Sequence, residues 1–452
     1  MRRKLIHNHY QLFSHMRFIK SIIAILLLIF SFPSKTEAQT EMTSKLLVEL
    51  LLKNNYEIQV ARDDSTIRDL AATRGNAGML PQVGINAGAT AQSSSINQRF
   101  SNGLEVNTSG VTGNGLNARA ELGWTLFDGG KMFIMYNRLK SELNLSSLQL
   151  KSTIEAEVEK VLLIYFDIVR NQQELNARKV SLDLSEEQVK IIQAKIVLGS
   201  ASRQELLQSN VDRNSAKSQL FSQQLLLDNL KLNLYRSIAV SQDSEYTYPQ
   251  NVESTFSSNL DDIASKAQKS NTQLLVFQNN QVLQDYFRKE IKSEMSPMLG
   301  LSASYGFNRT SNSAGFALFN QSIGLNGGLT LNWNLFNGSQ VNSRIKQSNI
   351  RFHQSELYIK QQTELISAEV KIAYKQWLQS KQILELEAEN LVAAEENLNL
   401  ATERLRVGQI GILPVKESQR SFQEAISRKS TADYQMHQAE ISLMKLAGEL
   451  LK

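Results

Sequence analysis

The sequence predicts a mainly helical, internally duplicated chain whose four strands form part of a membrane β-barrel. The duplication shows in the hexapeptide from Trp124 to Gly129, which recurs 209 residues later, with two substitutions, from Trp333 to Gly338. Before each copy, apolar and polar residues alternate with a period of two, as in a strand whose two faces differ. After each copy, about 68 residues run without a proline, which predicts one very long helix per repeat.

Residues 1–38 predict a secretory signal peptide that is not part of the fold. Basic residues precede an apolar run from Ile22 to Phe32, and Ala38 offers a small residue for cleavage before Gln39. The run is too short to span a bilayer as a helix, although a membrane anchor is the alternative interpretation. Translation from Met16 would leave a signal of ordinary length.

Composition excludes several classes of function. The leader holds six of the 49 basic residues and one of the 44 acidic ones, so the remaining chain is nearly neutral and has no basic stripe for nucleic acid. Cysteine is absent, which excludes disulfides, thiolate metal sites and a cysteine nucleophile. Beyond the leader only His353 and His437 remain, each alone on a predicted helix. Without a phosphate loop or a nucleophile elbow, we expect no enzyme activity, no metal and no cofactor.

The chain after the leader predicts a helix and then strands. Apolar residues at helical spacing from Leu46 to Ala61 predict a helix of about 30 residues that ends near Gly75, and Pro81 precedes the change to a period of two. The expected strands are about 82–92 and 116–127 in the first repeat and about 298–308 and 322–336 in the second, with polar loops over 93–115 and 309–321.

A half-buried sheet in a soluble protein would show the same alternation. Three observations favour a membrane barrel instead. The expected strands have the length that crosses a bilayer at a tilt, and their polar face includes Arg119 and Glu121, which suit a water-filled lumen. Aromatic residues that suit an interfacial girdle lie at the strand ends, namely Trp124, Phe127, Trp333 and Phe336.

A direct switch from strand to helix is predicted at Asp128-Gly129 and Asn337-Gly338. Asp and Asn are good helix caps, and glycine allows a sharp change of backbone direction. The helices that follow are expected over 131–198 and 340–407, each roughly 100 Å long at 1.5 Å per residue.

Each long helix must pack along other helices, because no small core buries such a length. Apolar residues recur every seven positions from Val161 to Ile196 and from Val370 to Leu405, which predicts coiled-coil packing. Gly199 and Gly408 predict the helix ends. Return helices complete the hairpins, expected over about 131–239 and 339–451.

Helix lengths then divide the chain into two repeats, 39–258 and 259–452. The first return helix and the helix expected over 259–294 would each span roughly 50 Å and together match one long helix. Four strands cannot close a barrel, and open sheet edges are not viable in lipid. Three chains would supply twelve strands around a lumen, continued by a cylinder of helices.

Together these features resemble the TolC-like outer membrane efflux protein family over about residues 43–451. The resemblance implies a homotrimer with a 12-stranded β-barrel in the outer membrane of a Gram-negative bacterium and an α-helical barrel in the periplasm. It also implies docking to a periplasmic adaptor (membrane fusion) protein and to an inner-membrane pump or ABC transporter.

In that family, acidic residues six and nine positions after the turn glycine ring the periplasmic entrance. The matching positions here are Glu205 and Gln208 at the first turn, and Pro414 and Glu417 at the second, so only two of the four are acidic. An acid at Glu205 also suits the first turn of a helix in its own right. The turns offer an adaptor-docking surface or are turn residues alone: Leu198, Gly199, Ser200, Val407, Gly408 and Gln409.

The leading hypothesis is a passive outer membrane duct for efflux or type I secretion. The rival is a structural or adhesive coiled-coil protein of the surface or periplasm without channel activity, which explains the helices but not the polar strand faces. An enzyme is the least supported class.

Overall fold

The computed structural model describes residues 40–241, 246–254, 256–315 and 317–451, so the predicted signal peptide lies outside the described residues. The chain divides into two units. In the small unit, β1 (Thr40–Glu41) pairs in parallel with β4 (Tyr246–Thr247). All other elements belong to the larger unit, which contains the residues from Ser44 onward apart from 243–249.

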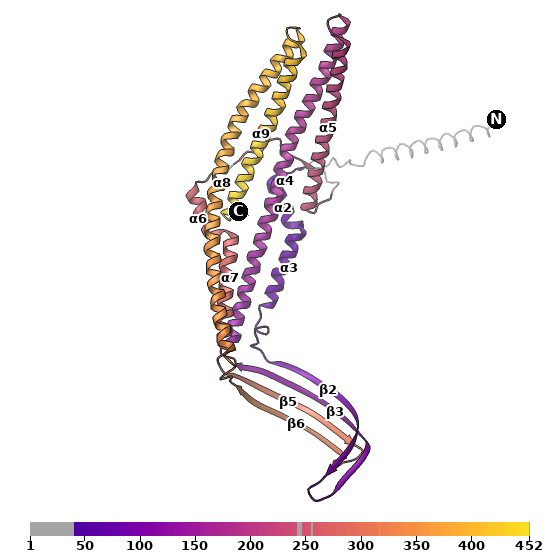
Figure 1. Ribbon diagram of the computed structural model, residues 1–452, viewed down its shortest axis with the longest axis vertical. Coiled ribbons are helices and arrows are strands. Elements are labelled where there is room, and N and C mark those ends of the chain that lie inside the picture. The colour runs from indigo at the N-terminus through magenta and orange to yellow at the C-terminus, as the bar shows by residue number, and fades with distance from the viewer. Residues whose placement is uncertain (1–39, 242–245, 255, 316, 452) are drawn as a thin grey trace, which may run out of the picture. The chain divides into compact units, whose positions relative to one another are not determined.

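The helices of the larger unit form two long hairpins and two shorter stacks (Figure 1). They are α2 (Ser44–Asn54), α3 (Tyr56–Ala71), α4 (Lys131–Val197), α5 (Arg203–Ser237), α6 (Leu260–Ser270), α7 (Thr272–Ser293), α8 (Gln340–Arg406) and α9 (Ile412–Leu446). Both long helices, α4 and α8, have 67 residues, one fewer than the sequence predicts. The single helices expected before each strand pair are each broken in two, at Asn55 and at Asn271.

The same asparagine joint accounts for both breaks. Each side chain caps the following helix by accepting a hydrogen bond from the backbone N–H three residues on, at 3.0 Å for Asn55 and 3.1 Å for Asn271. Each side-chain amide also donates to the last carbonyl of a return helix, Asn55 to Ser237 at 2.8 Å and Asn271 to Leu446 at 3.1 Å. The joint therefore ties the end of a return helix to the start of the helix stacked beyond it, in both repeats.

The four long strands form one antiparallel sheet in the order β2-β3-β5-β6 (Figure 1). Their bounds are β2 (Gln82–Arg99), β3 (Glu105–Phe127), β5 (Met298–Asn312) and β6 (Phe319–Asn332).

Several predicted strand boundaries are wrong. The loop expected over 309–321 is shorter, because β5 continues to Asn312 and β6 begins at Phe319. Residues 93–115 were expected to form a loop, but the strands continue through them and leave only 100–104 as the turn. Their Ser, Asn and Gly residues have low strand propensity, yet backbone pairing between β2 and β3 continues and overrides it. Conversely, β6 ends at Asn332 rather than Phe336, because its partner β5 begins only at Met298 and later residues have no strand to pair with.

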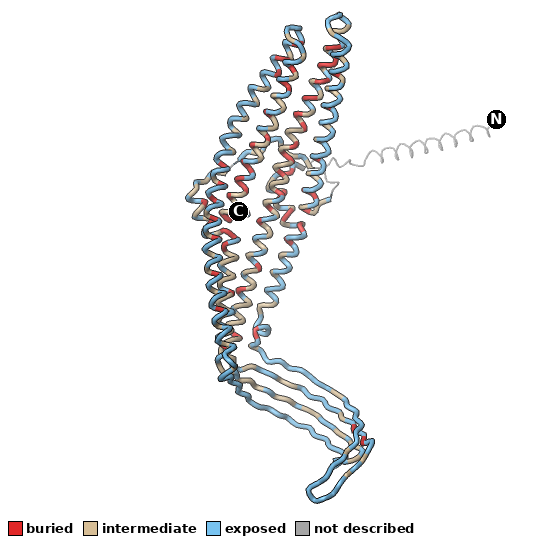
Figure 2. The backbone as a smooth tube through the Cα atoms, in the orientation of Figure 1, coloured by how far each residue is buried: buried red, intermediate tan, exposed pale blue. Residues whose placement is uncertain are grey.

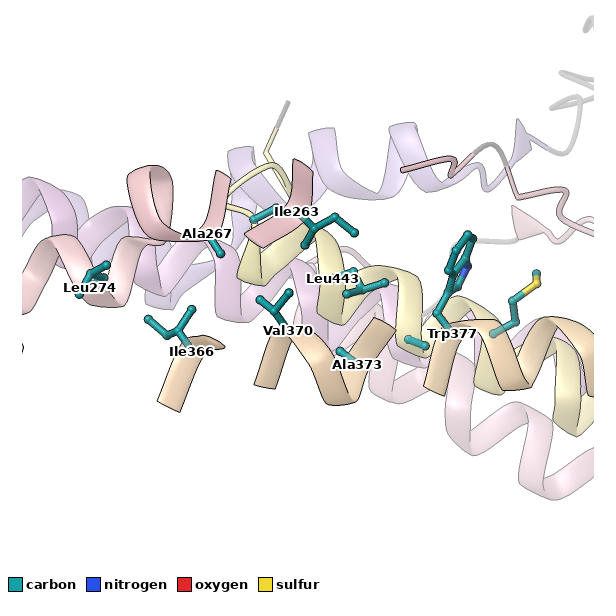
Figure 3. Close-up of a cluster of buried hydrophobic side chains, with 11 residues drawn as sticks. Ile263, Ala267, Leu274, Ile366, Val370, Ala373, Trp377 and Leu443 are labelled. Carbon is teal, nitrogen blue, oxygen red and sulfur yellow. The ribbon is translucent and has the colours of Figure 1, made fainter. Parts of the chain in front are cut away.

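Buried residues lie in narrow stripes along the helices, while most strand residues are exposed in the single chain (Figure 2). The expected heptad positions lie in these stripes, and Val161, Ile168, Val370 and Leu405 are each at most 1% exposed. A cluster where four helices meet combines Ile263 of α6, Leu274 of α7, Trp377 of α8 and Leu443 of α9 (Figure 3). The apolar seams therefore fix each hairpin and its stacked helix together.

We predict that Asn271→Ala lowers the melting temperature of the purified protein, followed by far-UV circular dichroism. The change removes a helix cap, typically about 1 kcal/mol, and leaves the Leu446 carbonyl without its donor. Asn271→Ser, which keeps a capping oxygen, should lose less. Asn390→Ala, at an exposed position of α8, is the control. If Asn271→Ala melted like the control, the joint would have no stabilising role.

Candidate functional site

The sheet has one apolar and one polar face, because its register aligns residues of the same kind across all four strands. One row across the sheet consists of Ile85, Ala120, Tyr305 and Leu325, and the adjacent row consists of Asn86, Arg119, Gly306 and Gly324. The alternation predicted from the sequence therefore extends across all four strands in the rows between Leu116 and Trp124. In the single chain the apolar face is bare, with Ile85 81% and Leu325 76% exposed. Such a surface requires an apolar environment, which lipid provides.

The tryptophans of the expected girdle are both anchored in the same way. The indole N–H of Trp124 donates to the Met79 carbonyl at 3.1 Å, and that of Trp333 donates to the Met295 carbonyl at 3.1 Å. Each acceptor lies two residues before a proline that precedes a strand. All four girdle residues are exposed in the single chain: Trp124, Phe127, Trp333 and Phe336.

The strand-to-helix switch depends on backbone with positive φ. Gly129 and Gly338 have φ of 73° and 65°, and the residues after them, Gly130 and Ser339, are also left-handed and occupy the N-cap positions. Asp128 and Asn337 therefore lie two residues before the caps, not at them as the sequence suggested. Asp128 still helps, since its Oδ2 accepts a hydrogen bond from the Met132 N–H at 2.9 Å.

Gly129 is constrained by space as well as by conformation. A Cβ at this position would lie 2.5 Å from the Ser296 Cβ and 2.7 Å from the Ser293 carbonyl oxygen, at the end of α7. At Gly338 no atom lies within 4 Å of such a Cβ. The two switches are thus alike in backbone but only the first is packed against another helix.

Both hairpin tips are closed by a glycine in the left-handed conformation, as expected. Gly199 and Gly408 have φ of 70° and 75°, and the following residues, Ser200 and Gln409, donate to carbonyls five residues back at 2.9 Å. All six predicted docking residues are exposed, and Leu198 reaches 80%. The tips therefore present small and apolar side chains to their surroundings.

In the single chain, the residues expected at the entrance form hydrogen bonds and ion pairs with neighbours in their own helix. Glu205 accepts a hydrogen bond from the Ser202 N–H at 2.6 Å, and Ser202 Oγ accepts from the Glu205 N–H at 3.2 Å, which makes a capping box. The backbone hydrogen bond from Ser202 holds the pKa of Glu205 below its ordinary value. Gln208 donates to Asp212 at 3.0 Å, and Glu417 lies 4.0 Å from Arg420. Each of these side chains interacts along its own helix.

Sequence reasoning missed a polar ladder between the two hairpins, formed by Ser181 and Gln188 of α4 with Gln419 of α9. Gln419 Nε2 donates to Ser181 Oγ at 3.0 Å, and Gln188 Nε2 donates to Gln419 Oε1 at 3.2 Å. All three side chains are at most 9% exposed. The seven-residue spacing of Ser181 and Gln188 was the available signal, but a search for apolar heptads passes over it.

Ion pairs near the tips support the ladder. Arg406 of α8 lies 2.7 Å from Glu187 of α4, and Lys416 of α9 pairs with Asp212 of α5. Each hairpin has an apolar seam inside it. The contact between the hairpins combines these polar pairs with apolar packing, since Ile191 of α4 packs against the cluster of Leu405 and Val415.

Among the described residues, no helix combines the length and apolar character needed to cross a bilayer. In the same part of the chain, no group of His, Asp and Glu side chains is arranged to hold a metal ion.

The sequence matches the family model for outer membrane efflux proteins over residues 47–240 and 263–449. The chain belongs to the outer membrane efflux protein family. This membership makes the protein an efflux channel of the outer membrane rather than an enzyme, as the sequence predicted. A search of curated proteins found no match.

Solved structures agree with this assignment at the level of fold. The Campylobacter jejuni CmeC outer membrane channel matches with a TM-score of 0.74 at 16% identity, covering 93% of this chain and 91% of CmeC. VceC of Vibrio cholerae matches with a TM-score of 0.70 at 14% identity, covering 90% of this chain and 96% of VceC. The open state of the Neisseria gonorrhoeae MtrE channel matches with a TM-score of 0.69 at 14% identity, covering 90% of this chain and 89% of MtrE.

We predict that Gly129→Ala impairs folding of this efflux channel far more than Gly338→Ala. Both substitutions force a positive φ on alanine, but only the first adds a clash with Ser293 and Ser296. The yield of detergent-extracted protein and its melting temperature compare the two variants. Equal losses would mean that conformation alone, and not the contact with the end of α7, requires glycine at this switch.

Proposed function

We propose that this family member is the outer membrane duct of a tripartite efflux or type I secretion assembly, and that it acts as a passive cyclic homotrimer. The observation that carries the proposal is the two-faced sheet, which has β2 and β6 as its edges. An edge strand in lipid must be paired, so the sheet requires copies of itself to close. Two copies would give an eight-stranded barrel filled by side chains, whereas three give twelve strands around a lumen.

The order of the helices supports the same closure. Among the described residues, α5 packs on α4, α4 on α9 and α9 on α8, while nearer the sheet the order is α3, α4, α7 and α8. One edge of this helical layer is therefore α8, and the other is α3 with α5. Each edge strand is connected to the helix at one edge of the layer, because β6 leads into α8 and α3 leads into β2.

Both helical edges carry exposed apolar residues at heptad spacing. On α8 they are Tyr358, Leu365, Ile372, Leu386 and Leu400, between 49% and 61% exposed. On the opposite edge they are Val60 and Ile67 of α3 and Val211, Leu225 and Leu232 of α5. Two such stripes match as a coiled-coil seam between neighbouring copies, and this head-to-tail contact closes into a ring.

The tips are the proposed entrance and docking surface. Their exposed Leu198 and Val407 suit a periplasmic adaptor, through which an inner-membrane pump or ABC transporter delivers solute. We assign Glu205, Gln208 and Glu417 to the rim of the entrance. Because the ladder between the hairpins is polar, water can replace its hydrogen bonds, which lowers the free-energy cost of loosening the entrance.

The rival, an adhesive coiled-coil protein without a channel, gives no reason for a sheet with one bare apolar face and one polar face. The family membership disfavours it as well.

We predict that Leu386→Glu abolishes trimer formation in detergent, measured by chemical crosslinking and light scattering. A charge in the seam between copies would have to be buried without a partner. Lys381→Glu, which also adds an acid to an exposed position of α8 but lies outside the heptad stripe, should remain trimeric. A trimeric Leu386→Glu protein would place the subunit contact elsewhere.

We predict that the wild-type protein gives conductance steps in planar bilayers, and that Gln419→Ala raises the open fraction roughly fivefold. Loss of the bonds to Ser181 and Gln188 weakens the closed entrance by about 1 kcal/mol, which corresponds to that factor. Gln438→Ala, an exposed position on the same helix, should behave like the wild type. Absence of any conductance in the wild type would overturn the duct.

A further inference from the structure

The polar face of the sheet is rich in glycine. The glycines in its rows are Gly84, Gly88, Gly113, Gly115, Gly123, Gly300, Gly306, Gly324 and Gly328. At four of them, a Cβ would meet no atom within 4 Å: Gly84, Gly123, Gly324 and Gly328. Glycine has a low strand propensity, so its repeated use on one face costs stability, and in the rows between Leu116 and Trp124 the apolar face has only Gly327. Because glycine has no side chain, little projects from this face at these positions and the space above it is open.

Two charged residues of β3, Arg119 and Glu121, project from this glycine-rich face. In the described rows between Leu116 and Trp124, they are the charged residues of the polar face. Arg309 occupies the apolar face at the end of these rows, opposite Leu116, and its guanidinium lies 5.3 Å from the centre of the Phe319 ring. Fixed charge on the polar face is thus concentrated at one level of the sheet.

The pair is held in place by its neighbours on adjacent strands. Arg119 Nη1 lies 3.3 Å from Glu121 Oε1, and Asn86 Nδ2 donates to Glu121 Oε2 at 3.0 Å. The arginine stem lies over Gly306, where a Cβ would be 3.5 Å from Arg119 Cγ. Beside the pair is a hollow of about 570 Å³, lined in part by Ser302, Ser304 and Asn326. Both charged side chains remain accessible, at 58% and 45% exposure.

We propose that Arg119 and Glu121 form a charge-balanced ring inside the barrel that sets the ion selectivity of its lumen. This ring is called the girdle below and is distinct from the aromatic residues at the strand ends. The inference rests on the proposed trimeric duct, which would bring three copies of each residue to one level of the lumen. Rings of charged side chains set selectivity in pores by the sign of their potential. Here each arginine is paired with a glutamate, so the wild-type girdle favours neither sign strongly and passes both cations and anions.

Unbalancing the pair tests the girdle. In Glu121→Gln, three arginines remain without their partners, and the chloride-to-potassium permeability ratio should rise about twofold or more at low salt, where screening is weak. In Arg119→Gln, three glutamates remain, and the ratio should fall by a similar factor. The double variant Arg119→Gln with Glu121→Gln should return close to the wild type. Reversal potentials of single channels under a KCl gradient give these ratios.

A closed entrance would dominate the measured selectivity, so each variant is also recorded together with Gln419→Ala, which we expect to loosen the entrance. Arg309→Gln removes a charge from the opposite face of the same sheet, and its selectivity should equal that of the wild type. Crosslinking confirms that each variant remains trimeric. If both single variants conduct with the wild-type ratio, or shift it in the same direction, the girdle is refuted while the duct stands. If the wild type itself does not conduct, the duct fails and the girdle with it.

Discussion

The unpaired backbone at the edges of the sheet is the constraint on which the rest of this structure depends. Within one chain, β2 and β6 each have one neighbour, and the sheet between them has a bare apolar face. In lipid no water is present to satisfy the free N–H and carbonyl groups of an edge. In the proposed trimer, pairing with further copies would satisfy them, and the same contact would cover the apolar stripes on the two helical edges. One requirement of the backbone thus couples the strands, the helices and the assembly.

Duplication explains how one chain keeps strands and helices in step. Each repeat contains a strand pair, a helix of 67 residues and a return helix of 35 residues. A return helix is about half as long as the helix it packs on, so a second helix must fill the remaining length. The asparagine joints at Asn55 and Asn271 hold these half-length helices end to end, because one amide side chain caps the lower helix and binds the end of the upper one.

The contacts inside and between the hairpins differ in chemistry, and this difference suits a duct with a movable entrance. Inside each hairpin the seam is apolar, with Val161 and Val370 almost fully buried, so separating its helices would expose core. Between the hairpins, Ser181, Gln188 and Gln419 bind one another through amides and a hydroxyl. Water can take over such bonds at modest cost, whereas it cannot replace apolar packing. The polar ladder is therefore the part of the contact between the hairpins that can open at the lowest cost, although Ile191 also packs there against Leu405 and Val415.

Periodicity in the sequence determined the elements whose form depends on local pattern. The period of two fixed the two faces of the sheet, the heptads fixed the seams, and Gly199 and Gly408 marked the tips, because each signal is carried by residues close in the chain. The tertiary structure decided what depends on distant partners. Residues 93–115 became strand because β2 and β3 pair there, and Asn55 and Asn271 became joints because the ends of α5 and α9 lie beside them. The polar ladder is recognised only when α4 and α9 are side by side, since the spacing of Ser181 and Gln188 on α4 does not say that Gln419 is their partner.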